Sequence, residues 1–352
     1  MRIIKRFRCH AAPVVLCVLA CAAHAAAQQY TVTDLGTLSG NKVSTAYALN
    51  NSGEAAGTSS TPTADIATMF SAGKATSVDT LGADVSVATA INGLGGIAGY
   101  NIFYSGPISG FQAFLYSSGS MKNLNSPSLF HYGTMALGIN NSGQVVGTGY
   151  FSSSQFHAFL YSGGKMTDLG PPGSYQASAA AINNSGQIVG SYYLTSGATG
   201  TFIYSKGKMT KLPVPAGSSA VGAFAINDNG EIAGALYSTS GAPPHAASYS
   251  NGVWTDLGAI TGAISNLAQG INIAGQVVGT AFFSPTQYEP PKPGKHVPFI
   301  HSGGGLVDLN TLIPSGGVFT LTDAVGINDS GQILCNATTA GSNQHAVLLT
   351  PQ

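Results

Sequence analysis

Short apolar runs separated by Gly, Ser and Asn recur along most of the chain, and one motif organises them. The motif is Ala-x-(Ala/Gly)-(Ile/Leu)-Asn-x-x-Gly-x-apolar-x-Gly. Its seven copies begin at Ala46, Ala88, Ala136, Ala179, Ala223, Ala268 and Ala324. Its marker asparagines are Asn50, Asn92, Asn140, Asn183, Asn227, Asn272 and Asn328, with separations of 42, 48, 43, 44, 45 and 56 residues. Repetition of this kind predicts an array of similar structural units.

Each repeat contains four short apolar segments, which predict four strands, named a to d. In the third copy they span residues 136–140, 144–147, 157–162 and 165–170. The Asn-x-x-Gly link between strands a and b favours a tight turn, because the Asn side chain can bond backbone amides and Gly tolerates a positive φ. Apolar spacing typical of helices is missing from the sequence.

Four short strands in a unit of this length indicate a blade of a β-propeller. The Ala- and Gly-rich strand a suits the innermost position, where large side chains would clash. A solenoid would need fewer strands per repeat, and an outer-membrane barrel would need longer ones. The sequence therefore predicts an all-β fold, a seven-bladed β-propeller with four-stranded blades.

The two ends of the chain complement each other. The last repeat has a strand c at residues 345–350 but no strand d. Residues 30–36 near the other end contain the Asp-Leu-Gly that ends strand d elsewhere. We expect this N-terminal strand to complete the last blade, which removes an exposed sheet edge.

The pattern of strands c and d resembles the HAF-repeat family of predicted extracellular bacterial proteins. The residues that carry the resemblance are His157-Ala158-Phe159 and the segment at residues 165–170. Other copies drift, for example Val297-Pro298-Phe299. The resemblance covers residues 28–352. It implies an exported repeat protein and supplies no catalytic residues.

The first 27 residues have the features of a secretory signal peptide: a basic start, an apolar stretch and Ala25-Ala26-Ala27. We expect cleavage after Ala27, which leaves residues 28–352 as a single domain in the periplasm or secreted. A lipoprotein signal ending at Cys21 is the weaker alternative. Of the four cysteines only Cys335 would remain, and we interpret it as a packing residue because it replaces a glycine of the motif.

Charge limits the possible partners. Residues 28–352 contain nine lysines, no arginine and thirteen carboxylates, a net charge of 9 − 13 = −4. Without arginine and with few lysines, nucleic acid is not an expected partner. No stretch after the leader predicts a membrane span, and we expect a monomer.

Candidate catalytic and metal-binding residues are few. Asp34, Asp168, Asp256 and Asp308 recur at one strand-d position and His157, His245 and His345 at one strand-c position, so we interpret both sets as architectural. No metal-binding spacing is found, and no cofactor is predicted. Four carboxylates are not repeated and are expected in or beside variable loops: Asp65, Asp84, Glu289 and Asp323. We predict a binding or scaffolding module at the cell surface or in the periplasm. A secreted hydrolase or lyase acting on a glycan, and a structural or adhesive surface repeat, both stay open as alternatives.

The links between strands b and c and between strands d and a vary most between repeats, and they are rich in aromatic residues. Variable loops on a rigid scaffold often carry function, and Tyr among Ser, Gly and Asn offers amphipathic contact area. We therefore predict that this end of the fold binds an extracellular glycan or an extended peptide. The candidate binding residues are Tyr100, Tyr104, Tyr132, Tyr150, Tyr192 and Tyr288.

Overall fold

A computed structural model describes residues 28–78, 81–105, 110–283 and 296–352. The described chain consists of β-strands apart from loops and one 3-10 turn, η1 (Leu309–Thr311). None of its helical segments is long and apolar enough to cross a membrane. The signal peptide expected at residues 1–27 and its cleavage site lie outside the described residues.

The strands follow the repeats in consecutive groups of four. The first three groups are β2 (Val43–Leu49), β3 (Ala55–Ser60), β4 (Asp65–Ser71), β5 (Lys74–Ser77); β6 (Val85–Ile91), β7 (Ile97–Phe103), β8 (Gly110–Ser117), β9 (Ser120–Asn123); and β10 (Gly133–Ile139), β11 (Val145–Tyr150), β12 (Phe156–Ser162), β13 (Lys165–Asp168). The next three are β14 (Ser174–Ile182), β15 (Ile188–Leu194), β16 (Thr199–Ser205), β17 (Lys208–Lys211); β18 (Ser218–Ile226), β19 (Ile232–Ser238), β20 (His245–Ser250), β21 (Val253–Gly258); and β22 (Ser265–Ile271), β23 (Val277–Phe282), β24 (His296–His301), β25 (Val307–Asp308). The last repeat supplies β26 (Phe319–Ile327), β27 (Ile333–Thr339) and β28 (Gln344–Pro351), and β1 (Tyr30–Asp34) pairs with β28.

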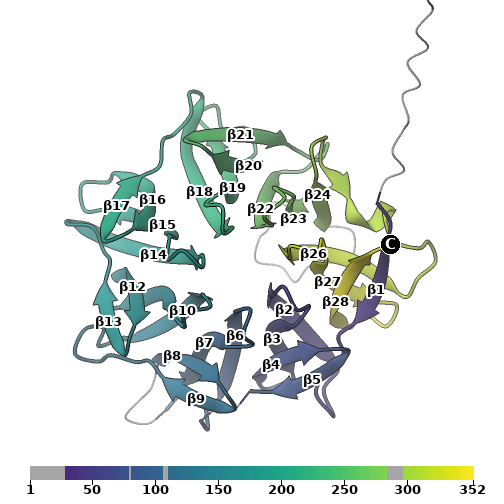
Figure 1. Ribbon diagram of the computed structural model, residues 1–352, viewed down its shortest axis with the longest axis horizontal. Coiled ribbons are helices and arrows are strands. Elements are labelled where there is room, and N and C mark those ends of the chain that lie inside the picture. Colours follow the sequence, from purple (N-terminus) through teal and green to yellow (C-terminus); the bar gives the residue numbers. More distant parts are fainter. Residues whose placement is uncertain (1–27, 79–80, 106–109, 284–295) are drawn as a thin grey trace, which may run out of the picture.

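Hydrogen bonding joins these strands into four four-stranded sheets and one twelve-stranded sheet. The large sheet contains three consecutive groups of four, which are linked only by single parallel bridges, Gly133 to Phe111 and Phe156 to Gln176. The groups lie around a common centre with the first strand of each group innermost (Figure 1). The architecture is therefore all-β and propeller-like, as the repeats predict.

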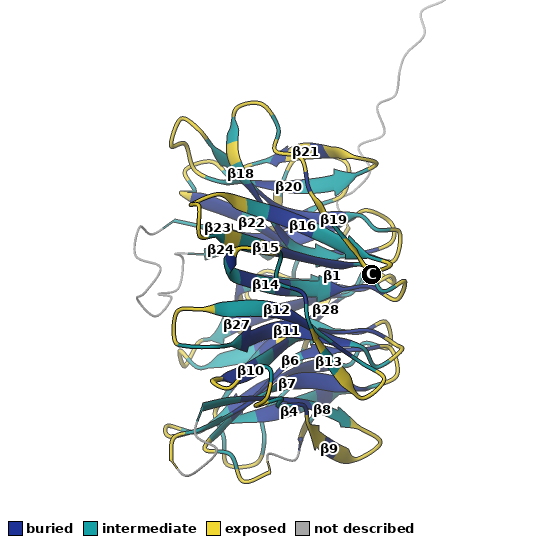
Figure 2. Ribbon diagram, turned by 90° about the vertical axis from the view of Figure 1, so that its left-hand side faces the viewer, coloured by how far each residue is buried: buried dark blue, intermediate teal, exposed yellow. Residues whose placement is uncertain are grey.

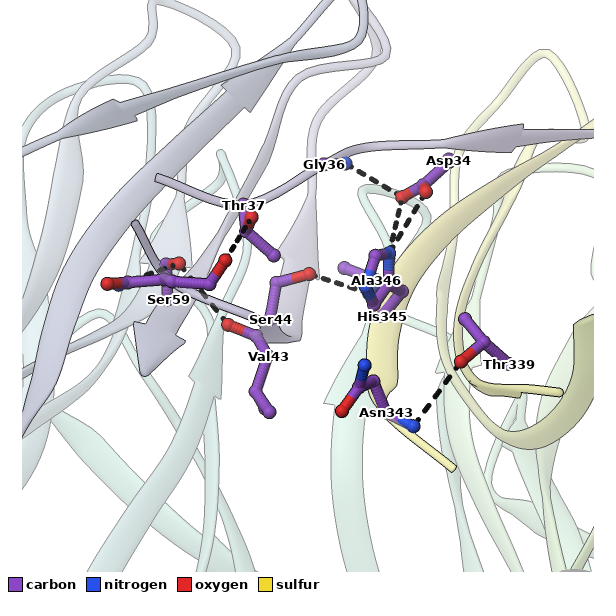
Figure 3. Close-up of polar contacts among 11 residues, drawn as sticks. Asp34, Gly36, Thr37, Val43, Ser44, Ser59, Thr339, Asn343, His345 and Ala346 are labelled. Carbon is purple, nitrogen blue, oxygen red and sulfur yellow. Dashed lines mark hydrogen bonds and ion pairs between the residues drawn. The ribbon is translucent and has the colours of Figure 1, made fainter. Parts of the chain in front are cut away.

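The pairing predicted between the two ends of the chain is confirmed. β1 runs antiparallel to β28 from Tyr30 opposite Pro351 to Asp34 opposite Val347. Both oxygens of the Asp34 carboxylate lie against the His345 ring, and Asp34 also accepts a hydrogen bond from the Gly36 amide (Figure 3). The N-terminal strand thus occupies the outer edge of the sheet formed by the last repeat.

The Asn-x-x-Gly links fold as predicted, and they also connect the repeats. In the third repeat, the Asn140 side-chain oxygen accepts from the amides of Ser142 and Gln144. Its nitrogen donates to the Gln144 side chain and to the carbonyl of Asn183 in the next repeat. Each marker asparagine donates to the next one's carbonyl in this way, at 2.9–3.2 Å, and Asn328 donates to Asn50. The seven buried amides therefore form a closed cycle, which satisfies polar groups that are costly to bury unpaired.

The glycine that ends the motif is required by close packing. A Cβ at Gly99 would lie 2.0 Å from the Val87 carbonyl oxygen and 2.6 Å from Cζ of Phe114, the phenylalanine opposite it on strand c. In the last repeat Cys335 stands at this position, and its neighbour on strand c is the smaller Val347. Cys335 is completely buried and burial raises the pKa of its thiol, which supports its interpretation as a packing residue.

Apolar contacts between neighbouring groups of strands form the core. One cluster joins Ala56 and Ala67 of the first repeat to Ala88, Ile97 and Phe114 of the second, and similar clusters recur along the described chain. The buried residues lie inside the strands, whereas the exposed residues are concentrated in the connecting loops (Figure 2). The loops are thus displayed on a packed scaffold.

Candidate binding face

The b–c and d–a links lie at one end of the strands, called the wide-loop face here, and the a–b and c–d turns lie at the other. This follows from the antiparallel order of strands in each group. The a–b turns are uniformly short, whereas the links of the wide-loop face differ between repeats. Residues 106–109 and 284–295, which belong to two of these links, lie outside the described residues.

Four aromatic rings form a continuous series near the wide-loop face, across the second and third repeats. Tyr100 meets Phe111 edge-on with ring centroids 6.0 Å apart, and Phe111 stacks on Tyr150 at 5.9 Å with an interplanar angle of 29°. Tyr150 then contacts Phe156 at 5.4 Å. All four rings, the aromatic row, are neither fully buried nor fully exposed. Such spacings are favourable for ring pairs and leave parts of the rings open to a ligand.

The aromatic row leads into a hollow of about 300 Å³ that is lined mainly by the fourth and fifth repeats. Its wall includes Phe156, Tyr192 and Tyr193, with Gln176, Ser191 and Thr199 as polar neighbours. Lys211 is the one charged residue in this lining within the described chain. The hollow is as large as the smaller ligand pockets of proteins, and its mixture of rings and hydroxyl or amide groups suits an uncharged polar ligand.

A glycine shapes the hollow. A Cβ at Gly200 would lie 2.4 Å from Cζ of Tyr192, so only glycine lets the Tyr192 ring lie flat across strand β16. The neighbouring Ser191 follows the glycine that ends the motif, where the second repeat has Tyr100 and the third has Thr148. Ser191 lines the hollow, so a small side chain stands here at the position that Tyr100 occupies in the second repeat.

The predicted binding residues fall into three groups. Tyr100 and Tyr150 belong to the aromatic row, and Tyr192 lines the hollow that continues it. Tyr104 and Tyr132 are 70% and 55% exposed on nearby links, without ring partners among the described residues. Tyr288 lies outside the described residues.

Some expected positions were wrong. Tyr100, Tyr150 and Tyr192 lie on strands β7, β11 and β15 rather than in links, because strand b extends further than its apolar run suggests. Phe130 does lie in a link, the one between β9 and β10, but it is completely buried and packs against Phe151 and Phe159. The aromatic content of these segments thus serves the core as well as the surface.

Burial also affects the tyrosine hydroxyls. It raises the pKa of Tyr100 and Tyr150 above the ordinary value of 10.0. The Tyr150 hydroxyl donates to Met135 Sδ at 3.4 Å. Both phenols are therefore neutral near pH 7, and the aromatic row offers a ligand no charge.

The repeated histidines and aspartates have a structural explanation. His157, His245 and His345 each place Nδ1 2.9 Å from the strand-d aspartate of the same sheet, Asp168, Asp256 and Asp34 respectively. Each aspartate also accepts from the amide of the glycine two residues later. Asp308 instead caps η1 by accepting from Asn310. These bonds support the architectural interpretation of both sets, and the His–Asp contacts lie within one sheet.

One of these pairs has a hydroxyl neighbour that the sequence analysis missed. Ser174 Oγ lies 2.9 Å from His157 Nε2, which gives the order Ser174, His157, Asp168 found in acyl-transfer sites. Ser174 is only 7% exposed, and the Phe151 ring meets His157 edge-on at 4.9 Å. The backbone carbonyl oxygen of Ser174 also lies 3.2 Å from His157 Nε2. The buried hydroxyl and the recurrence of the His–Asp pair in other repeats indicate a bond that orders the link before β14.

The carboxylates that are not repeated are dispersed. Asp84 accepts from the Tyr104 amide, and Asp65 begins strand β4. Asp323 was expected in or beside a loop, but it lies within β26, where His296 Nδ1 is 3.2 Å from its carboxylate. Glu289 lies outside the described residues. Among the described residues, no three His, Cys, Asp or Glu side chains gather in a geometry that would hold a metal ion.

Comparison with known proteins supports the fold. No family model and no curated protein matches the sequence. The structure is similar to the β-propeller domain of the trilobed protease from Pyrococcus furiosus, with a TM-score of 0.55 and 10% identity over 88% of this chain and 94% of that chain. It is also similar to an acylaminoacyl peptidase, with a TM-score of 0.55 and 12% identity over 89% of this chain and 52% of that one. Pyrococcus horikoshii acylaminoacyl peptidase gives a TM-score of 0.52 and 12% identity over 88% and 51% of the two chains.

The chain spans about half the length of the two acylaminoacyl peptidases. At such low identities the similarity shows the fold alone, a β-propeller type of architecture. What the chain binds must be argued from its own residues.

Proposed function

We propose that this chain is an exported binding module: a seven-bladed β-propeller, closed by its N-terminal strand, that binds a glycan on the wide-loop face. The observation that carries the binding role is the aromatic row together with the hollow into which it leads. The repeat motif, the pairing of β1 with β28 and the cycle of marker asparagines support the closed seven-bladed ring.

The chemistry of the face favours a neutral sugar polymer. Tyrosine and phenylalanine rings offer apolar surfaces on which the C–H faces of sugar rings can stack, and nearby amide and hydroxyl groups can bond the sugar hydroxyls. The row extends over successive repeats, so an extended chain contacts several rings at once. An acidic polymer would find only Lys211 as a cation in the hollow. An extended peptide is the second class of ligand that this surface suits.

Arrays of neutral glycans and of extended peptides, probed with residues 28–352, test this role. Tyr150→Ala and Tyr192→Ala are expected to weaken binding about tenfold or more, as aromatic anchors do. Tyr204→Ala is the matched control, because Tyr204 is a half-buried tyrosine at the tight-turn end of β16. Glycan binding that is unaffected by the first two variants and lost in the third would reverse the assignment. Binding to peptides alone would replace the glycan with a peptide.

Membership of the HAF-repeat family and export belong to the same proposal. The basic and apolar leader followed by Ala25-Ala26-Ala27 supports cleavage before Gln28 and a periplasmic or secreted location. N-terminal sequencing of protein recovered from an exporting host should begin at Gln28. A lipid on Cys21, or an intact leader, would contradict this processing.

A further inference from the structure

Every copy of the motif contains a β-bulge in the first strand of its group, at the second motif position. The register of β2 with β3 shifts between Ala46 and Ala48, so Tyr47 has no residue opposite it on β3. The same shift recurs in the other repeats. Bulges re-aim side chains and often occur beside functional sites. The bulge residues are Tyr47, Thr89, Leu137, Ala180, Phe224, Gln269 and Val325, and this is the position at which the motif varies most.

Several bulge residues meet around one hollow. A space of about 410 Å³ is lined by Tyr47, Phe224, Leu267, Gln269 and Val325, and we call it the axial hollow. These residues come from β2, β18, β22 and β26, which are innermost strands lying around the centre of the molecule (Figure 1). Four of the five are bulge residues. The axial hollow is therefore separate from the hollow lined by Tyr192.

The tight-turn end of this central region is narrow. The residues preceding the marker asparagines line a smaller hollow of about 200 Å³. Most of them are more than nine-tenths buried: Ile91, Ile139, Ile182, Ile271 and Ile327. The lining of this smaller hollow also includes several of the marker asparagines and Asp228 and Asp329, so the apolar residues alternate with polar ones at the tight-turn end.

The side chains that line the axial hollow favour an uncharged ligand. None of its five side chains carries a charge at neutral pH, because four have no ionisable group and a phenol is protonated there. Burial raises the pKa of the Tyr47 phenol further above 10.0. The Phe224 ring folds over Gly222, where a Cβ would lie 2.8 Å from Cζ. The Thr280 hydroxyl donates a hydrogen bond to Gln269 Oε1. The Gln269 side-chain nitrogen points away from this bond and can donate to a ligand. An anion would lose its hydration here without gaining a counter-charge, because none of the described residues that line the hollow is cationic.

We propose that the axial hollow is a second binding site, for an uncharged and mainly apolar small molecule that carries a ring system and one hydrogen-bond acceptor. The aromatic and aliphatic wall would pack against the ring system, and Gln269 would donate to the acceptor. The volume is within the range of small-molecule sites in proteins. This site does not depend on the glycan site proposed for the wide-loop face.

Nile red, an uncharged ring compound with a carbonyl acceptor, is a suitable probe for residues 28–352. We expect saturable, blue-shifted fluorescence with one site per chain. Val325→Trp fills the axial hollow and should weaken binding about tenfold or more, and Phe224→Ala should weaken it several-fold by removing a ring contact. The anionic probe 1-anilinonaphthalene-8-sulfonate should bind more weakly than Nile red.

Val318→Trp is the matched control, since Val318 is 65% exposed and does not line the axial hollow. It should bind Nile red like the unchanged protein, and so should Tyr192→Ala. If Val325→Trp fails to fold, Phe224→Ala decides, because Phe224 is only half-buried. The proposal is overturned if the unchanged protein shows no saturable binding or if folded hollow variants bind normally. Loss of binding in Tyr192→Ala alone would also overturn it, by placing the probe on the wide-loop face.

Discussion

Removal of residues 28–36 is expected to destabilise the whole molecule, because the strand β1 that they contain covers the outer edge of the last sheet. Tyr30 and Leu35 are 1% and 2% exposed, and the backbone of Tyr30 is tied to Leu312 and that of Leu35 to Ala346. Complete burial of a large apolar side chain contributes roughly 1.5–3 kcal/mol, so these two residues alone contribute about 3–6 kcal/mol. That is a large part of the roughly 5–15 kcal/mol that stabilises a typical domain.

Urea unfolding followed by circular dichroism measures the effect. The truncated chain should unfold at a much lower urea concentration, and Tyr30→Ala should lose about 3–5 kcal/mol. Thr33→Ala, at an exposed position of the same strand, should change the free energy of unfolding by less than about 0.5 kcal/mol. A synthetic peptide of residues 28–36 should restore stability to the truncated chain in proportion to its concentration. An unchanged unfolding midpoint after truncation would refute the proposed closure of the ring by β1.

Three further predictions follow from the packing and hydrogen bonds. Asn140→Ala removes four hydrogen bonds and should lower the free energy of unfolding by about 2–4 kcal/mol in the same urea assay. The control Asn141→Ala, on the exposed side of the turn, should lower it by less than about 1 kcal/mol. Gly147→Ala would place Cβ 2.0 Å from the Met135 carbonyl oxygen and should lower the melting temperature, with a loss of about 1–3 kcal/mol; an unaltered melting temperature would contradict the packing. Burial raises the pKa of Tyr47 in the folded state, so its neutral form stabilises the fold below pH 10 and this stability is lost as the pH rises further. Absorbance at 295 nm should show late ionisation of the buried tyrosines, and its amplitude should be smaller by one tyrosine in Tyr47→Phe; an equal amplitude would contradict the burial of Tyr47.

The sequence predicts those parts of the fold that depend on local chemistry. The marker asparagine and the glycine three residues later define each a–b turn by themselves, and the structure confirms that turn. The pairing of β1 with β28 was also predictable, because the missing strand in the last repeat and the extra strand at the other end share one motif. What local chemistry could not reveal is that each asparagine side chain also reaches the next repeat.

The parts that the sequence did not predict depend on strand length and register. The aromatic residues at 100, 150 and 192 lie beyond the glycine that ends the motif, where the repeats no longer share a pattern that shows how far strand b extends. The bond between His157 and Asp168 joins residues on adjacent strands of a hairpin, and a register aligned across the c–d turn would have indicated it. The bulges move one residue per repeat toward the centre of the molecule, and alternation along a strand does not reveal such a shift.

The location of the glycan site is the central functional claim, and hydrogen–deuterium exchange with and without a bound neutral oligosaccharide tests it most directly. The oligosaccharide is the one that binds best on the glycan array. We predict slower exchange in peptides that cover residues 110–111, 150–156 and 191–200, which surround the aromatic row and the hollow beside Tyr192. Exchange in the tight turns at residues 140–144 and 162–165 should be unchanged. Slower exchange confined to those tight turns would contradict the assignment of the wide-loop face as the binding surface.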